Sequence, residues 1–216
     1  MFDLYAITAE QPPADIERGV ARALAHEQAS RIAILLRAKH LSPEDRLSLG
    51  RALRAITRER GATFLVSADL ALCEELEADG VQLPERGPTV ASARRTLPAA
   101  RWVGASRHDA AGLASAAREG ASFATLSPVY ASPDKGAPLG EAGFAALVSQ
   151  ADLPVIALGG VEPHHVGVLL ERGACGVAVI RAVFDHSDPS AAAQSFLAEI
   201  DQARARATFK ASNRRL

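Results

Sequence analysis

Basic side chains, hydroxyls and a pair of glycines follow the short apolar runs of this sequence. A guanidinium is a planar fork of hydrogen-bond donors and an ammonium is a mobile point charge, so the two together suit a phosphate or diphosphate. Adjacent glycines allow a backbone to approach an anion closely. These features predict a binding site for a phosphorylated small molecule. Its expected residues are Arg37, Lys39, Ser106, Ser127, Ser132, Gly159, Gly160, Ile180 and Arg181.

Two residues are candidates for moving a proton. His108 follows an apolar run, and an imidazole titrates near neutral pH, although His108 could equally pack at a helix start capped by Asp109. Lys135 lies beside Asp134 in a long segment, 127–139, that follows another run. No set of His, Cys, Asp or Glu has the spacing of a metal site, so no metal ligand is predicted.

These residues must be positioned by the apolar runs themselves. Most runs are continuously apolar rather than alternating, which is typical of strands buried on both faces of a parallel sheet. The eight expected strands are 4–8, 32–36, 63–66, 80–83, 102–105, 123–126, 155–158 and 176–180.

The segments between the strands have helix-end signals. Ser42-Pro43 and Asp188-Pro189 each predict a capping residue followed by proline in the first turn. Gly61, Gly120 and Gly173 each precede a strand, where a left-handed glycine ends a helix. Eight strand–helix units predict an α/β protein, a single (β/α)8 TIM barrel with its site at the carboxyl ends of the strands. An open doubly wound sheet is the alternative, and it would need fewer strands.

Length and composition fit one domain. We expect the barrel to span 1–207 and residues 208–216 to form a basic, disordered tail. The net charge is -1, and no long apolar stretch or basic surface pattern predicts a membrane or nucleic-acid partner. Two isolated cysteines and the start MFDLYAITAE, which lacks a signal pattern, predict a cytoplasmic protein. A homodimer is compatible with this sequence but not specified by it.

Several stretches together resemble the thiamin phosphate synthase/TenI family, along nearly the whole chain. The resemblance implies a (β/α)8 barrel, a thiazole phosphate bound at the paired glycines, and a place in thiamin biosynthesis or salvage. The matching segments are LYAIT at 4–8, LRAK at 36–39, ADGVQL at 78–83, GASRH at 104–108, SPVY at 127–130 and PVIALGGV at 154–161.

The comparison with this family also identifies positions at which this chain differs from the family pattern. In the synthases, residues matching Arg37, Lys39 and Lys135 hold the pyrophosphate of the pyrimidine substrate. The Asn-Asp pair that helps to hold Mg2+ there corresponds to Ser67-Ala68, and a second aspartate corresponds to Gly87. The TenI branch moves a proton on a thiazole phosphate carboxylate without metal, but its histidine corresponds to Pro128.

Four readings of the function therefore remain. The first is a TenI-like thiazole tautomerase, which requires no cofactor. The second is a divergent thiamin phosphate synthase that joins hydroxymethylpyrimidine pyrophosphate to thiazole phosphate with Mg2+, held by the displaced carboxylates Asp69 or Glu85. The third is a non-catalytic binder of a phosphorylated thiazole or pyrimidine, and the fourth is an unrelated phosphosugar enzyme on the same fold.

Overall fold

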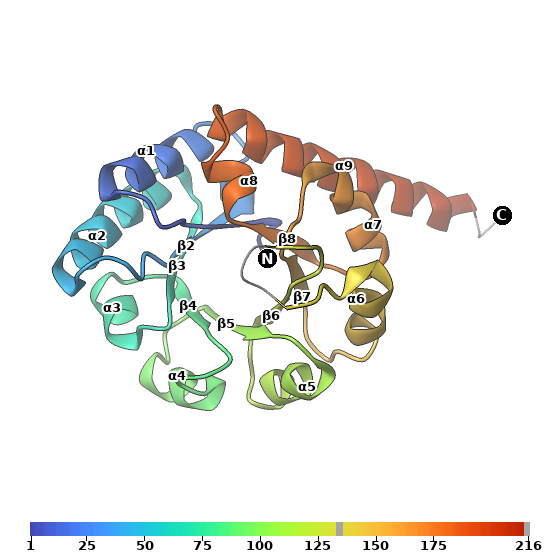
Figure 1. Cartoon of the computed structure of the whole chain (residues 1–216), viewed down its shortest axis with the longest axis horizontal. Helices are drawn as coiled ribbons and strands as arrows, with labels where there is room; N and C mark the ends of the chain where they lie inside the picture. Colours follow the sequence, from blue (N-terminus) through green and yellow to red (C-terminus); the bar gives the residue numbers. More distant parts are fainter. Residues whose placement is uncertain (133–135, 214–216) are drawn as a thin grey trace.

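The computed structural model describes residues 1–132 and 136–213, and its eight parallel strands close into a barrel in sequence order (Figure 1). The expected (β/α)8 barrel is confirmed, and the open doubly wound sheet is excluded because β1 pairs with both β2 and β8. The strands are β1 (Leu4–Ile7), β2 (Ile32–Leu36), β3 (Thr63–Ser67), β4 (Gly80–Leu83), β5 (Trp102–Arg107), β6 (Phe123–Leu126), β7 (Val155–Leu158) and β8 (Gly176–Val179).

Helices form a ring outside the barrel (Figure 1). The Ser42 hydroxyl accepts a hydrogen bond from the Asp45 amide at 3.1 Å, and the residue after α2, Gly61, is left-handed with a φ of 67°. Both end signals in the sequence therefore act as predicted. The helices are α1 (Pro13–Ala23), η1 (Ala29–Arg31), α2 (Pro43–Arg60), α3 (Leu70–Glu75), α4 (Val90–Thr96), α5 (Ala110–Arg118), α6 (Gly140–Val148), η2 (Pro163–His165), α7 (Val166–Glu171), α8 (Arg181–Phe184) and α9 (Pro189–Asn213). None of them, over the part of the chain that is described, is long and apolar enough to cross a membrane.

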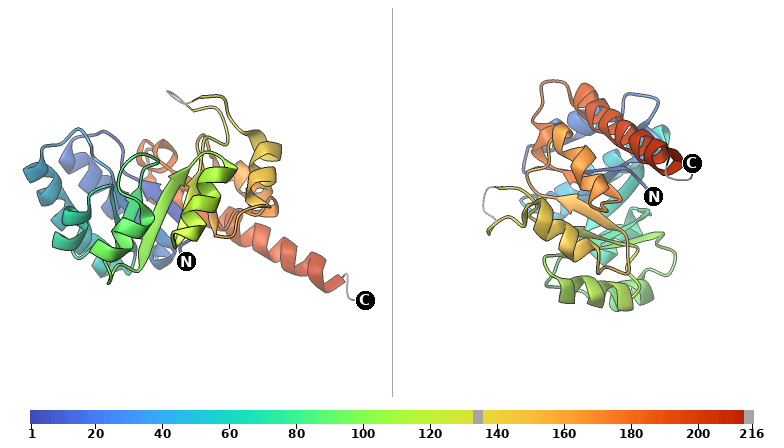
Figure 2. Two further views of the ribbon diagram at one scale, coloured as in Figure 1. Left: turned by 90° about the horizontal axis from the view of Figure 1, so that it is seen from below. Right: turned by 90° about the vertical axis from the view of Figure 1, so that its right-hand side faces the viewer.

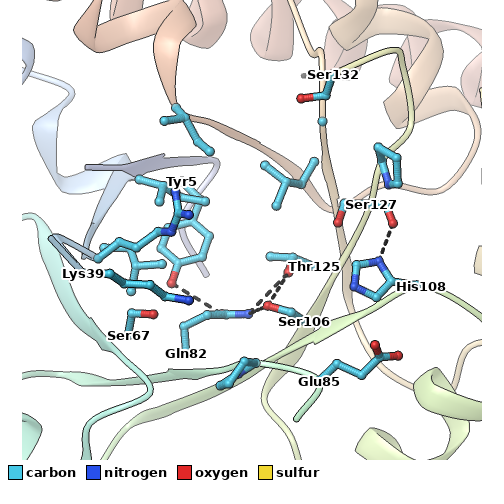
Figure 3. A pocket seen from close by; sticks show the side chains of 18 residues that line it. Tyr5, Lys39, Ser67, Gln82, Glu85, Ser106, His108, Thr125, Ser127 and Ser132 are labelled. Carbon is cyan, nitrogen blue, oxygen red and sulfur yellow. Dashed lines mark hydrogen bonds between the residues drawn. The ribbon is translucent and has the colours of Figure 1, made fainter. Parts of the chain in front are cut away.

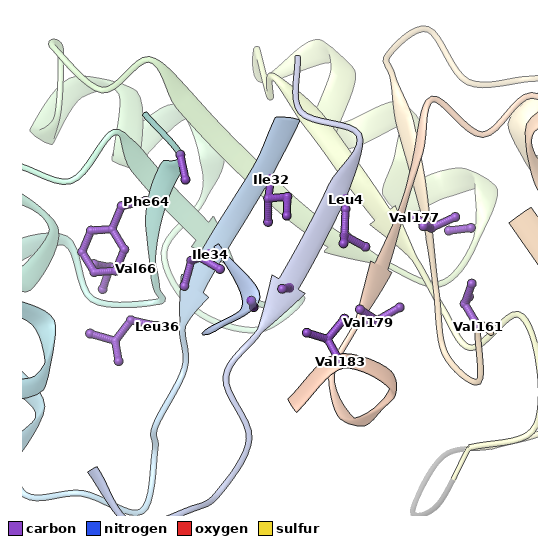
Figure 4. Close-up of a cluster of buried hydrophobic side chains, with 14 of the residues drawn as sticks. Leu4, Ile32, Ile34, Leu36, Phe64, Val66, Val161, Val177, Val179 and Val183 are labelled. Carbon is purple, nitrogen blue, oxygen red and sulfur yellow. The ribbon is translucent and has the colours of Figure 1, made fainter. Parts of the chain in front are cut away.

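The strands are buried on both faces, and this divides the core in two. Leu4 and Ala6 of β1 face outward into the layer between sheet and helices, together with Ile34 of β2 (Figure 4). Tyr5 and Ile7 face inward and pack inside the barrel. Because side chains alternate along a strand, each strand sends every second residue to the interior. A polar residue at an inward position therefore lies in the barrel and not at its surface.

Aromatic side chains close the amino-terminal end of the barrel. Phe2 packs against Tyr5, Trp102 and Phe123, with ring centroids 5.1 to 5.6 Å from its own. The rings of Tyr5 and Phe123 meet edge to face at 5.7 Å. Such contacts fill the interior as a packed core, so the cavity in this barrel belongs to the opposite end.

A partly buried ion-pair cluster ties the last helix to Asp3, the residue before the first strand. The Asp3 carboxylate accepts hydrogen bonds from Arg31 Nε at 2.7 Å and from Arg204 Nη2 at 2.6 Å. Burial by itself would raise the pKa of Asp3, but the two guanidinium groups outweigh it and the pKa is lowered. Asp3 therefore remains ionised and holds α9 against the barrel.

The helix α9 continues to Asn213 and so includes residues 208–213 of the expected basic tail. The Thr208 hydroxyl donates to the Arg204 carbonyl at 3.0 Å, and Lys210 Nζ lies 3.2 Å from a Glu171 carboxylate oxygen of α7. Contacts one turn apart and this ion pair support a helix where the composition suggested only a charged end. The helix extends beyond the barrel (Figure 2). Residues 214–216 lie outside the described part of the chain.

The aromatic cluster allows a stability prediction. Phe123→Ala should lower the free energy of unfolding by about 3–5 kcal/mol, because Phe123 is fully buried among three other aromatic rings. Urea denaturation measures this loss. The matched control is Phe209→Ala in α9, whose side chain is 68% exposed and whose loss should change stability by less than about 0.5 kcal/mol. Equal effects of the two substitutions would contradict the packing described here.

Candidate functional site

Two adjoining cavities open at the carboxyl ends of the strands. The larger has a volume of about 260 Å³ and the smaller about 90 Å³, and Ser132, Leu158, Gly159 and Ile180 line both. The location is the one expected for a barrel of this type. The predicted residues on the larger cavity are Arg37, Lys39, Ser106, His108, Ser127, Ser132, Gly159 and Ile180, and the smaller adds Gly160 and Arg181. Lys135 and Asp134 lie outside the described residues.

The cationic wall of the larger cavity comes from the end of β2. Arg37 and Lys39 both line the cavity, on either side of Ala38, whose φ is 27°. The Arg37 amide donates to the Thr8 hydroxyl at 2.9 Å, which fixes the backbone. The Arg37 guanidinium lies 3.9 Å from a Glu10 carboxylate oxygen. This long, half-exposed contact leaves the guanidinium able to bind an anion.

His108 is held in one orientation on the opposite wall (Figure 3). Its Nδ1 lies 2.6 Å from the carbonyl oxygen of Ser127, and a carbonyl can only accept a hydrogen bond. In the neutral ring, Nδ1 must therefore hold the proton, and Nε2 has the free lone pair. The Asp109 carboxylate separately accepts from the Gly112 amide at 2.7 Å, as expected of a cap. His108 is thus oriented as a hydrogen-bond acceptor or base at Nε2.

The paired glycines form the turn after β7, with φ values of 102° at Gly159 and 63° at Gly160. A Cβ on Gly160 would lie 2.6 Å from the Ala131 carbonyl oxygen. The Tyr130 amide donates to the Gly159 carbonyl at 3.0 Å. The glycines therefore permit both the left-handed turn and the close approach of the segment that follows β6. The helix after β8 has only four residues, which is too short to provide an anion site at its N-terminus. The glycine turn is therefore the main candidate for anion binding in the smaller cavity.

On the floor of the larger cavity, the predicted Ser106 meets three residues that were not predicted as site residues: Tyr5, Gln82 and Thr125. Gln82 of β4 bonds to Ser106 at 3.0 Å and to Thr125 at 3.3 Å, and the Tyr5 hydroxyl lies 3.4 Å from its Oε1 (Figure 3). Each of the three unpredicted residues is polar and lies between two apolar residues of its strand. This pattern could have identified them, because successive side chains of a strand point to opposite faces and the apolar neighbours face outward.

The residues near β3 and β4 do not fit a magnesium–diphosphate site. The Asp69 carboxylate accepts from the Leu72 amide at 3.0 Å and lies 3.3 Å from an Arg46 guanidinium nitrogen. Ala68 offers no side-chain ligand. Glu85 lines the cavity as a single carboxylate, and no group of three or more His, Cys, Asp or Glu that could hold a metal occurs in 1–132 and 136–213. Mg2+ prefers several hard oxygen ligands, which this arrangement does not supply.

Comparison with known proteins agrees with this barrel and its cavity. The family model described as thiamine monophosphate synthase matches residues 4–183. The chain belongs to this family. The family resemblance in the sequence, and with it an enzyme of thiamin biosynthesis, is confirmed at this level.

Relatives in the family cover almost the whole chain. A thiamine-phosphate synthase of Methanoculleus marisnigri is 36% identical over 214 residues, which cover 94% of this chain and 98% of the relative. A thiamine-phosphate synthase of Moorella thermoacetica is 31% identical over 211 residues, with coverage of 94% and 98%. The solved thiamine phosphate pyrophosphorylase from Pyrococcus furiosus superimposes with a TM-score of 0.83 at 26% identity and covers 94% of this chain and 96% of its own.

The glycine turn allows a binding prediction. Gly160→Val should weaken binding of inorganic phosphate by about tenfold or more, because a β-branched residue at a φ of 63° is strained and would collide with the Ala131 carbonyl. Isothermal titration calorimetry measures the affinity, and circular dichroism checks that the barrel is intact. Gly167→Ala in α7, where an added Cβ meets nothing within 4 Å, is the matched control. Unchanged affinity in the Gly160→Val variant would refute phosphate binding at this turn.

Proposed function

We propose that the protein binds a thiazole phosphate across the two cavities. The phosphate lies in the smaller cavity at Gly159 and Gly160, and the ring lies in the larger cavity. The volumes support this division, since the smaller cavity has room for little more than an anion. A turn of two left-handed glycines supplies backbone close to an anion, and Arg181 adds a positive charge beside it. Family membership supports the choice of a thiazole over a sugar phosphate.

The reaction we propose is a metal-independent proton transfer on the bound thiazole, as in a tautomerase. The observation that carries this proposal is the fixed orientation of His108, whose Nδ1 is 2.6 Å from the Ser127 carbonyl. Nε2 takes a proton from one position of the ligand, and the resulting imidazolium returns it at another, so no co-reactant is required. The ring lies among neutral hydroxyl and amide groups on the floor of the cavity, and the single carboxylate Glu85 adds no metal site.

The second candidate is the synthase reaction, in which a pyrimidine pyrophosphate is joined to the thiazole phosphate. The names of the relatives favour it, as do Arg37 and Lys39, two cations on one wall of the larger cavity. They provide positive charge for a pyrophosphate leaving group. The residues that this chain has after β3 and β4 do not fit the Mg2+ that such a coupling implies.

Proton exchange tests the first candidate. Solvent deuterium should enter a thiazole phosphate carboxylate bound to the wild-type protein, and His108→Gln should slow this exchange by about 100-fold or more, because the base is lost. Nuclear magnetic resonance follows the exchange, and calorimetry shows whether binding is retained. His164→Gln, an exposed histidine of η2, is the matched control. Binding without exchange in the wild-type protein would indicate a non-catalytic binder.

A thiochrome fluorescence assay separates the two candidate reactions. The protein is mixed with hydroxymethylpyrimidine pyrophosphate, thiazole phosphate and Mg2+, and we expect no thiamin phosphate above a blank, since the metal ligands are missing. An active synthase from a relative serves as the positive control. Turnover by this protein would establish the synthase reaction and would show that Mg2+ is held by carboxylates other than the expected pair. An Asp69→Asn and a Glu85→Gln variant would then identify them.

A further inference from the structure

We infer that Tyr5 and Gln82 act as positioning residues which fix the direction of the hydrogen bonds on the cavity floor, so that Ser106 offers a hydroxyl proton to the ligand. This inference rests on the proposed thiazole phosphate ligand and deepens it. The floor would select a ligand whose deepest group accepts a hydrogen bond, such as a ring nitrogen or a carboxylate, over one whose deepest group donates.

Four polar side chains form a continuous chain across the barrel (Figure 3). The Tyr5 hydroxyl donates to Gln82 Oε1 at 3.4 Å. Gln82 Nε2 donates to Ser106 Oγ at 3.0 Å and to Thr125 Oγ1 at 3.3 Å. Thr125 Oγ1 donates in turn to Ser106 Oγ at 3.4 Å. The chain therefore joins four different strands, β1, β4, β5 and β6.

The direction of this chain follows from the burial of Tyr5. The side chain has no exposed surface, and Gln82 is the only hydrogen-bond partner that the described residues give its hydroxyl. Burial raises the pKa of Tyr5 well above its usual value, so the phenol keeps its proton. If the Gln82 amide were reversed, this proton would be buried without an acceptor, which is costly. The amide oxygen must therefore face Tyr5.

The orientation of Gln82 then decides what Ser106 can do. With its oxygen toward Tyr5, the amide directs both of its N–H groups at hydroxyl oxygens, those of Ser106 and Thr125. Thr125 is 1% exposed and gives its own proton to Ser106. Ser106 accepts both bonds, so its proton is the one left for another partner. Ser106 is partly exposed and lines the cavity, so that partner is the ligand.

The geometry of Gly104 supports a fixed amide. A Cβ at this position would lie 2.2 Å from Gln82 Oε1 and 2.4 Å from the Phe123 ring. The absence of a side chain at Gly104 in β5 thus leaves room for the Gln82 amide oxygen between the aromatic cluster and the cavity. The Gln82 side chain is 5% exposed and is held by packing as well as by its hydrogen bonds.

A double-mutant cycle tests the inference. Tyr5→Phe removes only the hydroxyl and frees the Gln82 amide to turn, so the affinity for thiazole phosphate should fall by about tenfold. Ser106→Ala should cause a similar loss because it removes the donor itself. In the Ser106→Ala background, Tyr5→Phe should cause no further loss, since Tyr5 acts through Ser106. Calorimetry with thiazole phosphate gives the four affinities.

Two controls separate this effect from damage to the fold or to the phosphate site. Tyr130→Phe removes the hydroxyl of the second tyrosine, which bonds to Glu141 at 3.2 Å, and should leave the affinity unchanged. Inorganic phosphate has no ring to contact Ser106 on the cavity floor, so it should bind equally to the wild-type protein and to Tyr5→Phe.

The outcomes distinguish the inference from the proposed function. If Tyr5→Phe lowers the affinity for thiazole phosphate equally in the presence and absence of Ser106, or does not lower it, the positioning role is overturned. The proposed ligand is not affected by that result. If the wild-type protein binds thiazole phosphate no better than inorganic phosphate, the proposed ligand is wrong, and the inferred donor role of Ser106 is overturned with it.

Discussion

Closure of the parallel sheet into a barrel restricts where every strand side chain of this protein can lie. Every strand is hydrogen-bonded on both edges and buried on both faces, so each side chain has only two places to go. Outward positions such as Leu4 pack under the helices, and inward positions such as Tyr5 share one narrow interior. The amino-terminal half of that interior is filled by aromatic rings. Polar inward side chains consequently gather at the carboxyl end, where they form the floor of the cavity.

The site combines side chains on the strands of the barrel with segments that follow those strands. Its floor consists of strand residues whose positions the barrel fixes, whereas its rim consists of segments that follow the strands. The glycine turn after β7 joins the two, because Gly160 gives space for the Ala131 carbonyl while it lines the smaller cavity. A substitution at this turn would therefore change both the anion site and the segment after β6. One pair of residues thus couples the proposed phosphate site to the shape of the rim.

The electrostatics of the site differ from those of a metal-dependent diphosphate centre. Asp69, which follows Ala68 in the chain, accepts a hydrogen bond from the Leu72 amide of α3 and pairs with Arg46, and so it serves the fold. The charged residues that line the two cavities are the cations Arg37, Lys39 and Arg181 and the carboxylates Glu85 and Glu162. Neutral donors and a fixed imidazole occupy the centre. This composition is the basis on which we propose an anionic ligand and proton transfer, in place of metal-assisted departure of pyrophosphate.

The eight strands, the barrel and the strand ends around the site could be predicted from the sequence, because apolar runs, glycine stops and capping residues are local signals. The positions of Gly159, Gly160 and His108 at the carboxyl face could be predicted for the same reason. Local signals could not predict that α9 continues to Asn213, where Lys210 pairs with Glu171 of α7. They also could not predict which nitrogen of His108 is free or that Tyr5, Gln82, Ser106 and Thr125 meet. These depend on contacts between strands far apart in the chain, and such contacts arise only when the sheet closes.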